Sequence, residues 1–292
     1  MTAGIVNVLK PPGMTSHDVV SFMRRVYGLK KVGHAGTLDP AAAGVLPVFL
    51  GPATRLIEFT TDADKSYRAE LTFGYATDSG DDSGEVIAVR TDFVMPAEKE
   101  ITAALASFLG ESEQVPPMHS AIKVDGRKLY ELARAGIEID RQPRTVNISS
   151  VALVRMAAPA ILFDVTCSKG TYIRTLCADI GERCGCPAVM SFLVRTRVGD
   201  FTLEAAKALE EIAAAPDAAL LPTDYAVRHM PRVVLDDAAA ARFGHGQAIA
   251  HGEPCGPDLH AVYDRSANLL GIARPAPTAS LLMPVKVLGP TP

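Results

Sequence analysis

Apolar positions recur at helical spacing shortly after the N-terminus, and they predict the first helix of the chain. These positions are Val19, Phe22, Met23 and Val26. Thr15 and Asp18 have the spacing of a capping box at its start, and Gly28 supplies a stop. The preceding segment "IVNVLK" predicts a short strand, and a Pro-Gly turn separates it from the helix.

Alternation of apolar and polar residues predicts strands further along. The segment "YRAELTFGY", residues 67–75, alternates like a half-buried strand, and "EVIAVR", residues 85–90, follows as a second strand. The stretch "TDSGDDSGE" between them resembles a calcium loop only loosely. It lacks Gly at the sixth position, counted from Asp78, and Glu at the twelfth, so we expect an acidic turn.

Three further segments complete the expected core. One face of a helix ending at Gly110 is formed by Ile101, Ala104, Leu105, Phe108 and Leu109. The segment "AILFDVTC" predicts a strand, followed by a Lys-Gly turn and a helix with Ile173, Leu176, Cys177 and Ile180 inward. The stretch "KKVGHAGTLDPAAAGVLPVFLG" predicts a loop from Gly33 to Pro40 that runs into a short buried helix or turn up to Pro47.

The later part of the chain divides into a protruding segment and a small terminal unit. Residues 114–146 are bounded by prolines, contain a short predicted helix at 130–134, and are expected to protrude. The Ala/Pro-rich residues 213–222 are expected to lead out of the main unit. From about Pro231 onward, short apolar runs alternate with Gly and Pro turns, which predicts a small all-β unit.

Composition is that of an ordinary soluble globular protein, since 48% of the 292 residues are apolar and 21% are charged. The net charge of −4 does not by itself indicate a nucleic-acid binder. Residues 76–113, however, hold nine acids and two bases, whereas residues 114–146 hold six bases and four acids. Much of the acidity is therefore local, and the bases are free to form a patch elsewhere.

The cysteines predict neither a disulfide framework nor a metal site. They are Cys167, Cys177, Cys184, Cys186 and Cys255. Their odd number, their irregular spacing and the lack of a signal peptide predict reduced thiols in a cytoplasmic protein. Cys184-Gly-Cys186 has no second paired motif and no nearby His to complete a zinc site. No apolar run reaches the length of a membrane span, so no membrane partner is expected.

Asp39 is the single acidic side chain in the glycine-rich stretch. It is either a turn residue or a reactive group that the backbone of a ligand must approach closely, and spacing alone favours the turn. A reactive carboxylate needs a cation and an aromatic platform, for which Arg174 and Tyr67 are candidates. Motifs typical of common hydrolases, nucleotide-binding proteins and metalloenzymes are absent from the sequence.

Six segments in order resemble the motifs of TruB-type tRNA pseudouridine synthases, and they span roughly residues 5 to 203. They are "LKPPGMTSHDVV", "GHAGTLDPAAAGVLPV", "KSYRAELTFGYATDSGD", "PPMHSAIKVDGRKLYELAR", "GTYIRTL" and "FLVRTRVGDF". The resemblance implies an α+β pseudouridine synthase fold, with a mixed, largely antiparallel sheet core flanked by helices. It also implies a catalytic domain over residues 1–230, with an inserted thumb at about 114–146, and a small PUA-like RNA-binding β domain over 231–292.

The same resemblance implies an activity and the residues that carry it. The family isomerises uridine 55 in the T-loop of tRNA to pseudouridine, without a cofactor or a metal. Asp39 corresponds to the essential carboxylate, Arg174 to its cationic partner and Tyr67 to the ring that stacks on the flipped base. His34 corresponds to a residue that contacts the vacated RNA. Leu193 corresponds to an apolar wall of the pocket, and Lys10 to an element that supports the site.

The resemblance also implies contacts with the T-arm of tRNA. Basic residues expected to contact the RNA are Lys30, Lys31, Lys123, Arg127, Lys128, Arg141 and Arg144. His119 stands where the family commonly has Tyr. We expect a monomer.

Two alternatives stay open: a tRNA-binding or tRNA-folding protein on the same scaffold, and a guide-dependent pseudouridine synthase. The intact set of Asp39, Tyr67 and Arg174 argues against the first, and the long thumb argues against the second.

Overall fold

The computed structural model describes residues 3–120, 122–124, 126–250, 258–276 and 281–288. Its main feature is a nine-stranded sheet with the path β1-β3-β12-β4-β11-β10-β7, to which β2 adds on β3 and β13 on β12. The strands are β1 (Gly4–Lys10), β2 (Val32–His34), β3 (Ala43–Leu50), β4 (Lys65–Phe73), β7 (Gly110–Gln114), β10 (Arg144–Ala157), β11 (Ala160–Cys167), β12 (Ala188–Val198) and β13 (Phe201–Thr202). Only β3 and β12 run parallel among the paired strands of this sheet. The expected mixed, largely antiparallel core is confirmed.

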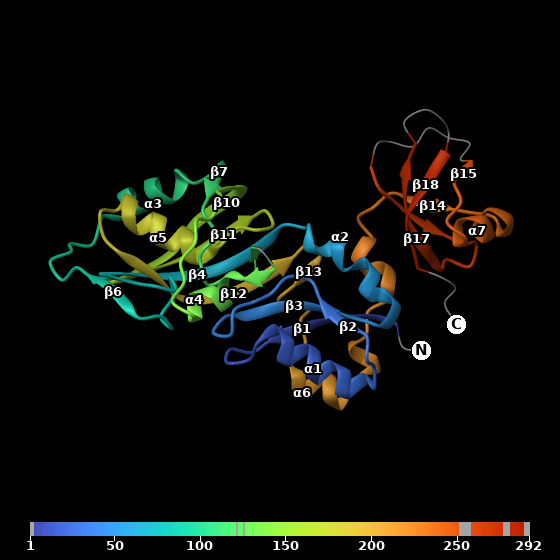
Figure 1. The fold of residues 1–292 in the computed structure, drawn as a ribbon, viewed down its shortest axis with the longest axis horizontal. Coiled ribbons are helices and arrows are strands. Elements are labelled where there is room, and N and C mark those ends of the chain that lie inside the picture. Colours follow the sequence, from blue (N-terminus) through green and yellow to red (C-terminus); the bar gives the residue numbers. More distant parts are fainter. Residues whose placement is uncertain (1–2, 121, 125, 251–257, 277–280, 289–292) are drawn as a thin grey trace.

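Helices cover the sheet at its two ends (Figure 1). The predicted first helix is α1 (Ser16–Tyr27), which begins with the capping box of Thr15 and Asp18 and ends at Gly28 in the left-handed conformation. Helix α1 packs with α6 (Leu209–Ala214) against β1 through buried residues such as Met23 and Ile212. At the other end, α3 (Glu98–Ala106) and α5 (Ile173–Arg183) pack on β10 and β12.

Two predictions in this core were wrong. The segment expected to be a short buried helix or turn up to Pro47 is the strand β3, because its apolar run is buried between β1, β2 and β12. A short apolar run has no period that separates a buried strand from a helix. The helix expected to end at Gly110 ends instead at Ala106, with Ser107 as its C-cap, and Gly110, with φ of 91°, begins β7.

The segment expected to lead out of the main unit instead crosses back over it. Ile5 and Leu221 exchange backbone hydrogen bonds of 2.9 and 2.8 Å. A Cβ atom on Gly4 would lie 2.6 Å from the Leu220 side chain, so only glycine allows this approach. Composition could not predict it, because the contact depends on an apolar leucine pair at the end of a segment that is otherwise rich in Ala and Pro.

Two hairpins extend from the sheet. The expected acidic turn lies between β5 (Tyr75–Thr77) and β6 (Val86–Val89), which pair antiparallel with each other, and the strand expected over residues 67–75 is divided between β4 and β5. The thumb carries β8 (Lys123–Val124), β9 (Arg127–Lys128) and the helix α4 (Leu129–Arg134). Leu129 and Leu132 are the buried apolar anchors of this short helix.

The C-terminal strands form a separate sheet of five, in the order β14-β16-β17-β18-β15. They are β14 (Arg232–Val234), β15 (Ile249–Ala250), β16 (His260–Tyr263), β17 (Leu269–Pro275) and β18 (Leu281–Val287). The unit is not all-β as expected, since α7 (Asp237–Gly244) packs on it through Phe243. The proposed domain boundary at residues 230/231 stays a prediction.

The two sheets share one hydrophobic cluster through a bridge of short helices. These helices are η1 (Gly51–Leu56), α2 (Ile57–Thr61) and η3 (Thr223–Val227), whereas η2 (Asp217–Ala219) packs through Ala219 on the cluster that contains α1 and β1. Phe49 and Phe201 of the large sheet lie in the same buried cluster as Tyr263 and Ile272 of the small one. Burial of this shared apolar surface joins the C-terminal unit, at one end of the molecule in Figure 1, to the main body.

Substitution of Gly44 tests whether the close approach of β3 to β12 requires glycine at this position. Its φ is 113°, and a Cβ atom there would lie 2.2 Å from the carbonyl oxygen of Arg195. We expect Gly44→Ala to lower the free energy of unfolding by about 2–4 kcal/mol, measured by urea titration. Gly13 has φ of 87° but no atom within 4 Å of such a Cβ, so Gly13→Ala should cost about 1 kcal/mol. Equal losses in both variants would contradict a steric role for Gly44.

Candidate active site

The loop that carries Asp39 is held in place by buried side chains from several elements. The Ser16 hydroxyl, in the first turn of α1, accepts a hydrogen bond from the amide of Leu38 at 2.9 Å and donates one to its carbonyl at 3.1 Å. Lys10, at the end of β1, donates from Nζ to the carbonyls of Pro11, Pro40 and Ala42 at 2.8, 3.2 and 2.7 Å. Asp39 therefore lies between two fixed points of the backbone.

Asp39 and Arg174 form the central ion pair. Arg174 Nε lies 3.0 Å from Asp39 Oδ2, and Nη2 lies 3.5 Å from Oδ1. The Arg174 side chain is 6% exposed and the Asp39 side chain 37%. The guanidinium is thus buried, whereas the carboxylate is open on one side to a ligand. A charge-assisted pair of this kind orients the carboxylate.

Arg174 also binds two segments that are remote in the sequence. Its Nη1 donates to the Ser79 carbonyl at 3.0 Å, in the turn between β5 and β6. Its Nη2 donates to the His119 carbonyl at 2.8 Å, at the start of the thumb. A single buried guanidinium therefore joins the Asp39 loop, the acidic turn and the thumb.

A second carboxylate, that of Asp81, stands beside the pair. Its Oδ2 atom lies 3.9 Å from Arg174 Nε, and its Oδ1 atom accepts hydrogen bonds from Ser79 and Ser83. Burial by itself raises the pKa of Asp81, but the hydrogen bonds from these serines and the charge of Arg174 hold that pKa below its ordinary value. Asp81, whose pKa is lowered, is therefore a second anion within reach of Arg174 at neutral pH.

Tyr67 and Leu193 line the same region from adjacent strands. Both side chains are buried and belong to one hydrophobic cluster with Leu38. Burial raises the pKa of the Tyr67 hydroxyl, and the positive charge of Arg195 opposes that rise. Tyr67 pairs with Arg195 across the β4–β12 ladder. The phenol is therefore neutral at physiological pH and can act only as a proton donor or a stacking surface.

His34 lies at the end of β2, beside the loop. Burial, with the charge of Arg195, lowers the pKa of its imidazole, and its buried Nδ1 has no hydrogen-bond partner. The ring is therefore neutral at pH 7. Arg195 itself donates to the carbonyls of Gly36, Thr37 and Val45, at both sides of the loop.

The structure separates the predicted RNA-contacting bases into two groups. Lys30, Lys31, Lys123, Arg127 and Arg144 are exposed. Lys128 donates from Nζ to the Tyr130 hydroxyl at 3.1 Å. Arg141 pairs with Glu138 at 3.1 Å and donates to the Pro116 carbonyl at 3.3 Å. The last two side chains are thus partly used within the thumb.

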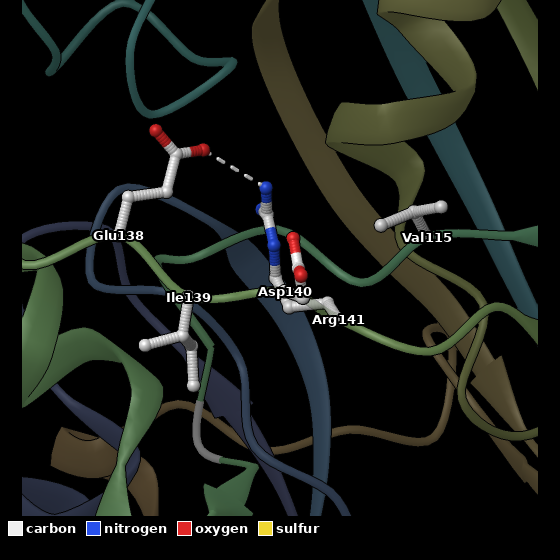
Figure 2. A pocket seen from close by; sticks show the side chains of 5 residues that line it. All are labelled: Val115, Glu138, Ile139, Asp140 and Arg141. Atoms are coloured by element: carbon white, nitrogen blue, oxygen red, sulfur yellow. Dashed lines mark hydrogen bonds and ion pairs between the residues drawn. The ribbon is translucent and has the colours of Figure 1, made fainter.

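Arg141 also lines a cavity of about 390 Å³ at the base of the thumb. Figure 2 shows its Glu138 ion pair above Ile139, with Val115 on the opposite wall. Asp39, Tyr67 and Arg174 are not among the residues that line it. This cavity is therefore distinct from the surroundings of the central ion pair.

The remaining chemistry of the described residues is limited. Within those ranges, no group of three or more His, Cys, Asp or Glu side chains is placed to hold a metal ion. Cys167, Cys177, Cys184 and Cys186 are free thiols, and Cys255 lies outside the described residues. In the part of the chain that the structure covers, no helix has the length and apolarity to cross a membrane.

The sequence analysis missed three side chains of this site. Arg195 could have been found from the strand pattern, because it lies two residues after Leu193 and so on the same strand face. Asp81 belongs to the stretch interpreted only as an acidic turn. Gln114, at the end of β7, accepts from the Tyr172 amide at 2.7 Å and donates to its carbonyl at 3.1 Å, which fixes the start of α5. Nothing in the sequence connects residues so far apart.

Three family models match consecutive parts of the chain. "TruB family pseudouridylate synthase (N terminal domain)" matches residues 24–173, and "tRNA pseudouridylate synthase B C-terminal domain" matches residues 174–228. "Pseudouridine synthase II TruB, C-terminal" matches residues 231–288. Together the matches include Asp39, Arg174 and all described strands of both sheets except β1.

Similar proteins cover most of the chain. The tRNA pseudouridine synthase B of Alkaliphilus oremlandii is 48% identical over 280 residues, which is 93% of each chain. That of Symbiobacterium thermophilum is 53% identical over 85% of this chain and 83% of its own. Among solved structures, a Cbf5-Nop10-Gar1 complex gives a TM-score of 0.76 at 30% identity, over 98% of this chain and 85% of the other. An H/ACA RNP bound to a substrate RNA gives 0.75 at 28% identity, over 98% and 85%.

Lys10 makes the free energy of unfolding depend on pH. Burial lowers its pKa from 10.5 to about 8, so between these pH values the unfolded chain holds a proton that the folded protein has lost. Stability linked to this group therefore rises with pH above about 8. We measure the free energy of unfolding by urea titration at pH 8.0 and at pH 9.5. Between these pH values we expect it to rise by about 1 kcal/mol more in the wild type than in Lys10→Met.

The control for this measurement is Lys99→Met, which changes an exposed lysine on α3. The free energy of unfolding of Lys99→Met should differ from that of the wild type by the same amount at both pH values. A Lys10→Met difference that does not change with pH, or that changes in the opposite direction, would contradict the assignment of a lowered pKa to Lys10.

Proposed function

Because this chain belongs to the TruB family of pseudouridylate synthases, we propose that it is a stand-alone enzyme that isomerises uridine 55 in the T-loop of tRNA to pseudouridine. The observation that carries the proposal is the Asp39–Arg174 ion pair, with a buried cation and a carboxylate open on one side. Relatives at 46–53% identity are named tRNA pseudouridine synthase B. No electrons are gained or lost in the isomerisation, so the chain's own residues suffice without a cofactor.

Asp39 is the proposed catalytic carboxylate. It either attacks C1′ of the sugar as the N-glycosidic bond breaks, or adds to C6 of the uracil. In both routes the N1–C1′ bond breaks, the uracil turns in place and its C5 bonds to C1′, and the C5 proton is then lost. The bond to Asp39 breaks as C5 displaces the carboxylate from C1′ in the first route, and by elimination from C6 in the second. The second carboxylate, Asp81, would also hold the guanidinium of Arg174, because both carboxylates approach Nε, at 3.0 Å for Asp39 and 3.9 Å for Asp81.

Tyr67, Leu193 and His34 are proposed to receive the flipped nucleotide. A uridine in a folded T-loop must leave its stack before any group can reach C1′ or C6, and this costs a few kcal/mol. The buried ring of Tyr67 and the apolar side chain of Leu193 offset that cost by stacking and burial. His34 is neutral, so it fills space beside the RNA without adding charge.

The thumb and the loop after α1 are proposed to contact phosphates. Their exposed bases, Lys30, Lys31, Lys123, Arg127 and Arg144, can approach a T-arm without giving up an internal ion pair. Lys128 and Arg141 would first have to leave partners within the thumb. We therefore assign the larger electrostatic share to the exposed group, acting on a single tRNA as a cytoplasmic monomer.

The stand-alone activity is favoured over a guide-dependent one. The H/ACA RNP structures are 26–30% identical to this chain, whereas the relatives named tRNA pseudouridine synthase B reach 53%. The thumb at residues 114–146 gives the chain a way to hold an RNA by itself. Activity that required an added guide complex would reverse this choice.

The first test of the function is Asp39→Asn. The wild type should convert uridine to pseudouridine in an unmodified T-arm hairpin, whereas the variant should lose at least about 10³-fold in single-turnover rate. Binding of the hairpin should change by less than about threefold. Pseudouridine formed by Asp39→Asn at a rate close to wild type would place the chemistry on another residue.

The thumb bases can be tested through salt dependence. We expect Lys123→Ser/Arg127→Ser to weaken T-arm binding and to reduce the slope of log Kd against log salt concentration by about 1–2. The rate at saturating RNA should be unchanged. Lys99→Ser on α3 is the matched control, and it should keep the wild-type slope. An unaltered slope in the double variant would remove these two bases from the RNA contact.

A further inference from the structure

Arg195 is the largest fully buried side chain of the described residues, at 1% exposure. It lies on the central strand β12, next to the loop that carries Asp39. None of the ion pairs found in the described ranges involves it. A guanidinium buried without an anion is costly, and a well-packed apolar residue would be a cheaper core element.

The three hydrogen bonds that Arg195 donates to backbone carbonyls go to the two sides of the Asp39 loop. On the upstream side, Nη2 donates to the Gly36 carbonyl at 2.9 Å and Nη1 to the Thr37 carbonyl at 3.3 Å. On the downstream side, Nε donates to the Val45 carbonyl at 2.8 Å, in β3. The rigid fork of a guanidinium therefore fixes the distance between the loop segment before Asp39 and the strand β3 after it.

Two glycines make room for this arrangement. Gly36 has φ of 89°, and a Cβ atom there would lie 3.4 Å from Arg195 Nη1. Gly44 passes so close to the Arg195 backbone that any side chain would collide with it. The glycine content of the loop thus follows from its close approach to one buried arginine as well as from the needs of a bound RNA.

Arg195 also contacts the other element of the proposed site. It stands directly across the β4–β12 ladder from Tyr67. The side chains of the two residues interact, as the mutual effect of each on the other's ionisation shows. A single side chain is therefore linked to the loop of the carboxylate and to the ring proposed to stack on the base.

We propose that Arg195 is a positioning residue for the isomerisation, which sets Asp39 and Tyr67 at the spacing that the flipped nucleotide requires. The inference rests on the proposed function. It predicts that a change in Arg195 displaces the carboxylate relative to the nucleotide while the binding surface of the thumb stays intact. Displacements of about 1 Å in such a constellation can reduce a rate by about 100-fold.

The test compares Arg195→Lys and Arg195→Met with the control Arg197→Lys. Arg197 lies on the same strand and is partly buried, but it donates to Ser66 and Gly199 instead of the loop. For each protein we would measure the single-turnover rate at saturating unmodified T-arm hairpin, the Kd of that hairpin, thermal unfolding, and amide hydrogen exchange in residues 35–42.

We expect Arg195→Lys to remain folded, because lysine keeps the charge and one of the three sets of hydrogen bonds. Its rate should fall by about 10- to 100-fold, with Kd within threefold of wild type and faster exchange in residues 35–42. Arg197→Lys should match the wild type in all four measurements. Arg195→Met should lose at least as much rate as Arg195→Lys.

Several results would overturn the proposal. A folded Arg195→Lys with a rate within threefold of wild type would do so, as would unchanged exchange in residues 35–42. Failure of Arg195→Lys to fold would show a purely structural role. If the wild type formed no pseudouridine in the hairpin, the proposed function would fail instead, and the exchange data would still report whether Arg195 holds the loop.

Discussion

The buried guanidinium of Arg174 is the constraint on which the arrangement of the site depends. A cation removed from water must find acceptors in fixed positions. Arg174 finds them in Asp39, in the Ser79 carbonyl and in the His119 carbonyl, which come from three segments far apart in the sequence. Folding of the sheet brings these acceptors together, and one side of the Asp39 carboxylate remains exposed.

Around the Asp39 loop, too, backbone carbonyls accept the hydrogen bonds of buried cations. Lys10 and Arg195 each bind three carbonyls of the loop or its flanks, and Lys65 binds the carbonyls of Thr61 and Ala63 nearby. Burial lowers the pKa of Lys65 to about 8, as it does for Lys10. Because the backbone carbonyls of this loop make the contacts that hold it in place, its side chains need not make them. This explains why the loop can consist largely of Gly, Ala and Pro.

Sequence reasoning succeeded where the determinants are local. The capping box of Thr15, the stop at Gly28 and the alternation of residues 67–73 all predicted elements that the structure contains. It failed at β3, where a continuous apolar run has no distinguishing period. The pairing of Asp39 with Arg174 came only from resemblance to a family, since no local pattern connects two residues 135 positions apart. Strand alternation places Arg195 on the same face as Leu193, but its backbone-carbonyl partners carry no sequence signal.

The most direct test of this account is the single-turnover rate of Arg174→Met on a saturating T-arm hairpin. Methionine fills much of the same volume but offers Asp39 no cation. The account predicts a rate at least about 100-fold below wild type with Kd within a few-fold, because the carboxylate loses its orienting charge. Arg183→Met, at the end of the same helix, controls for effects on α5. A rate for Arg174→Met close to wild type would contradict the central role of the ion pair.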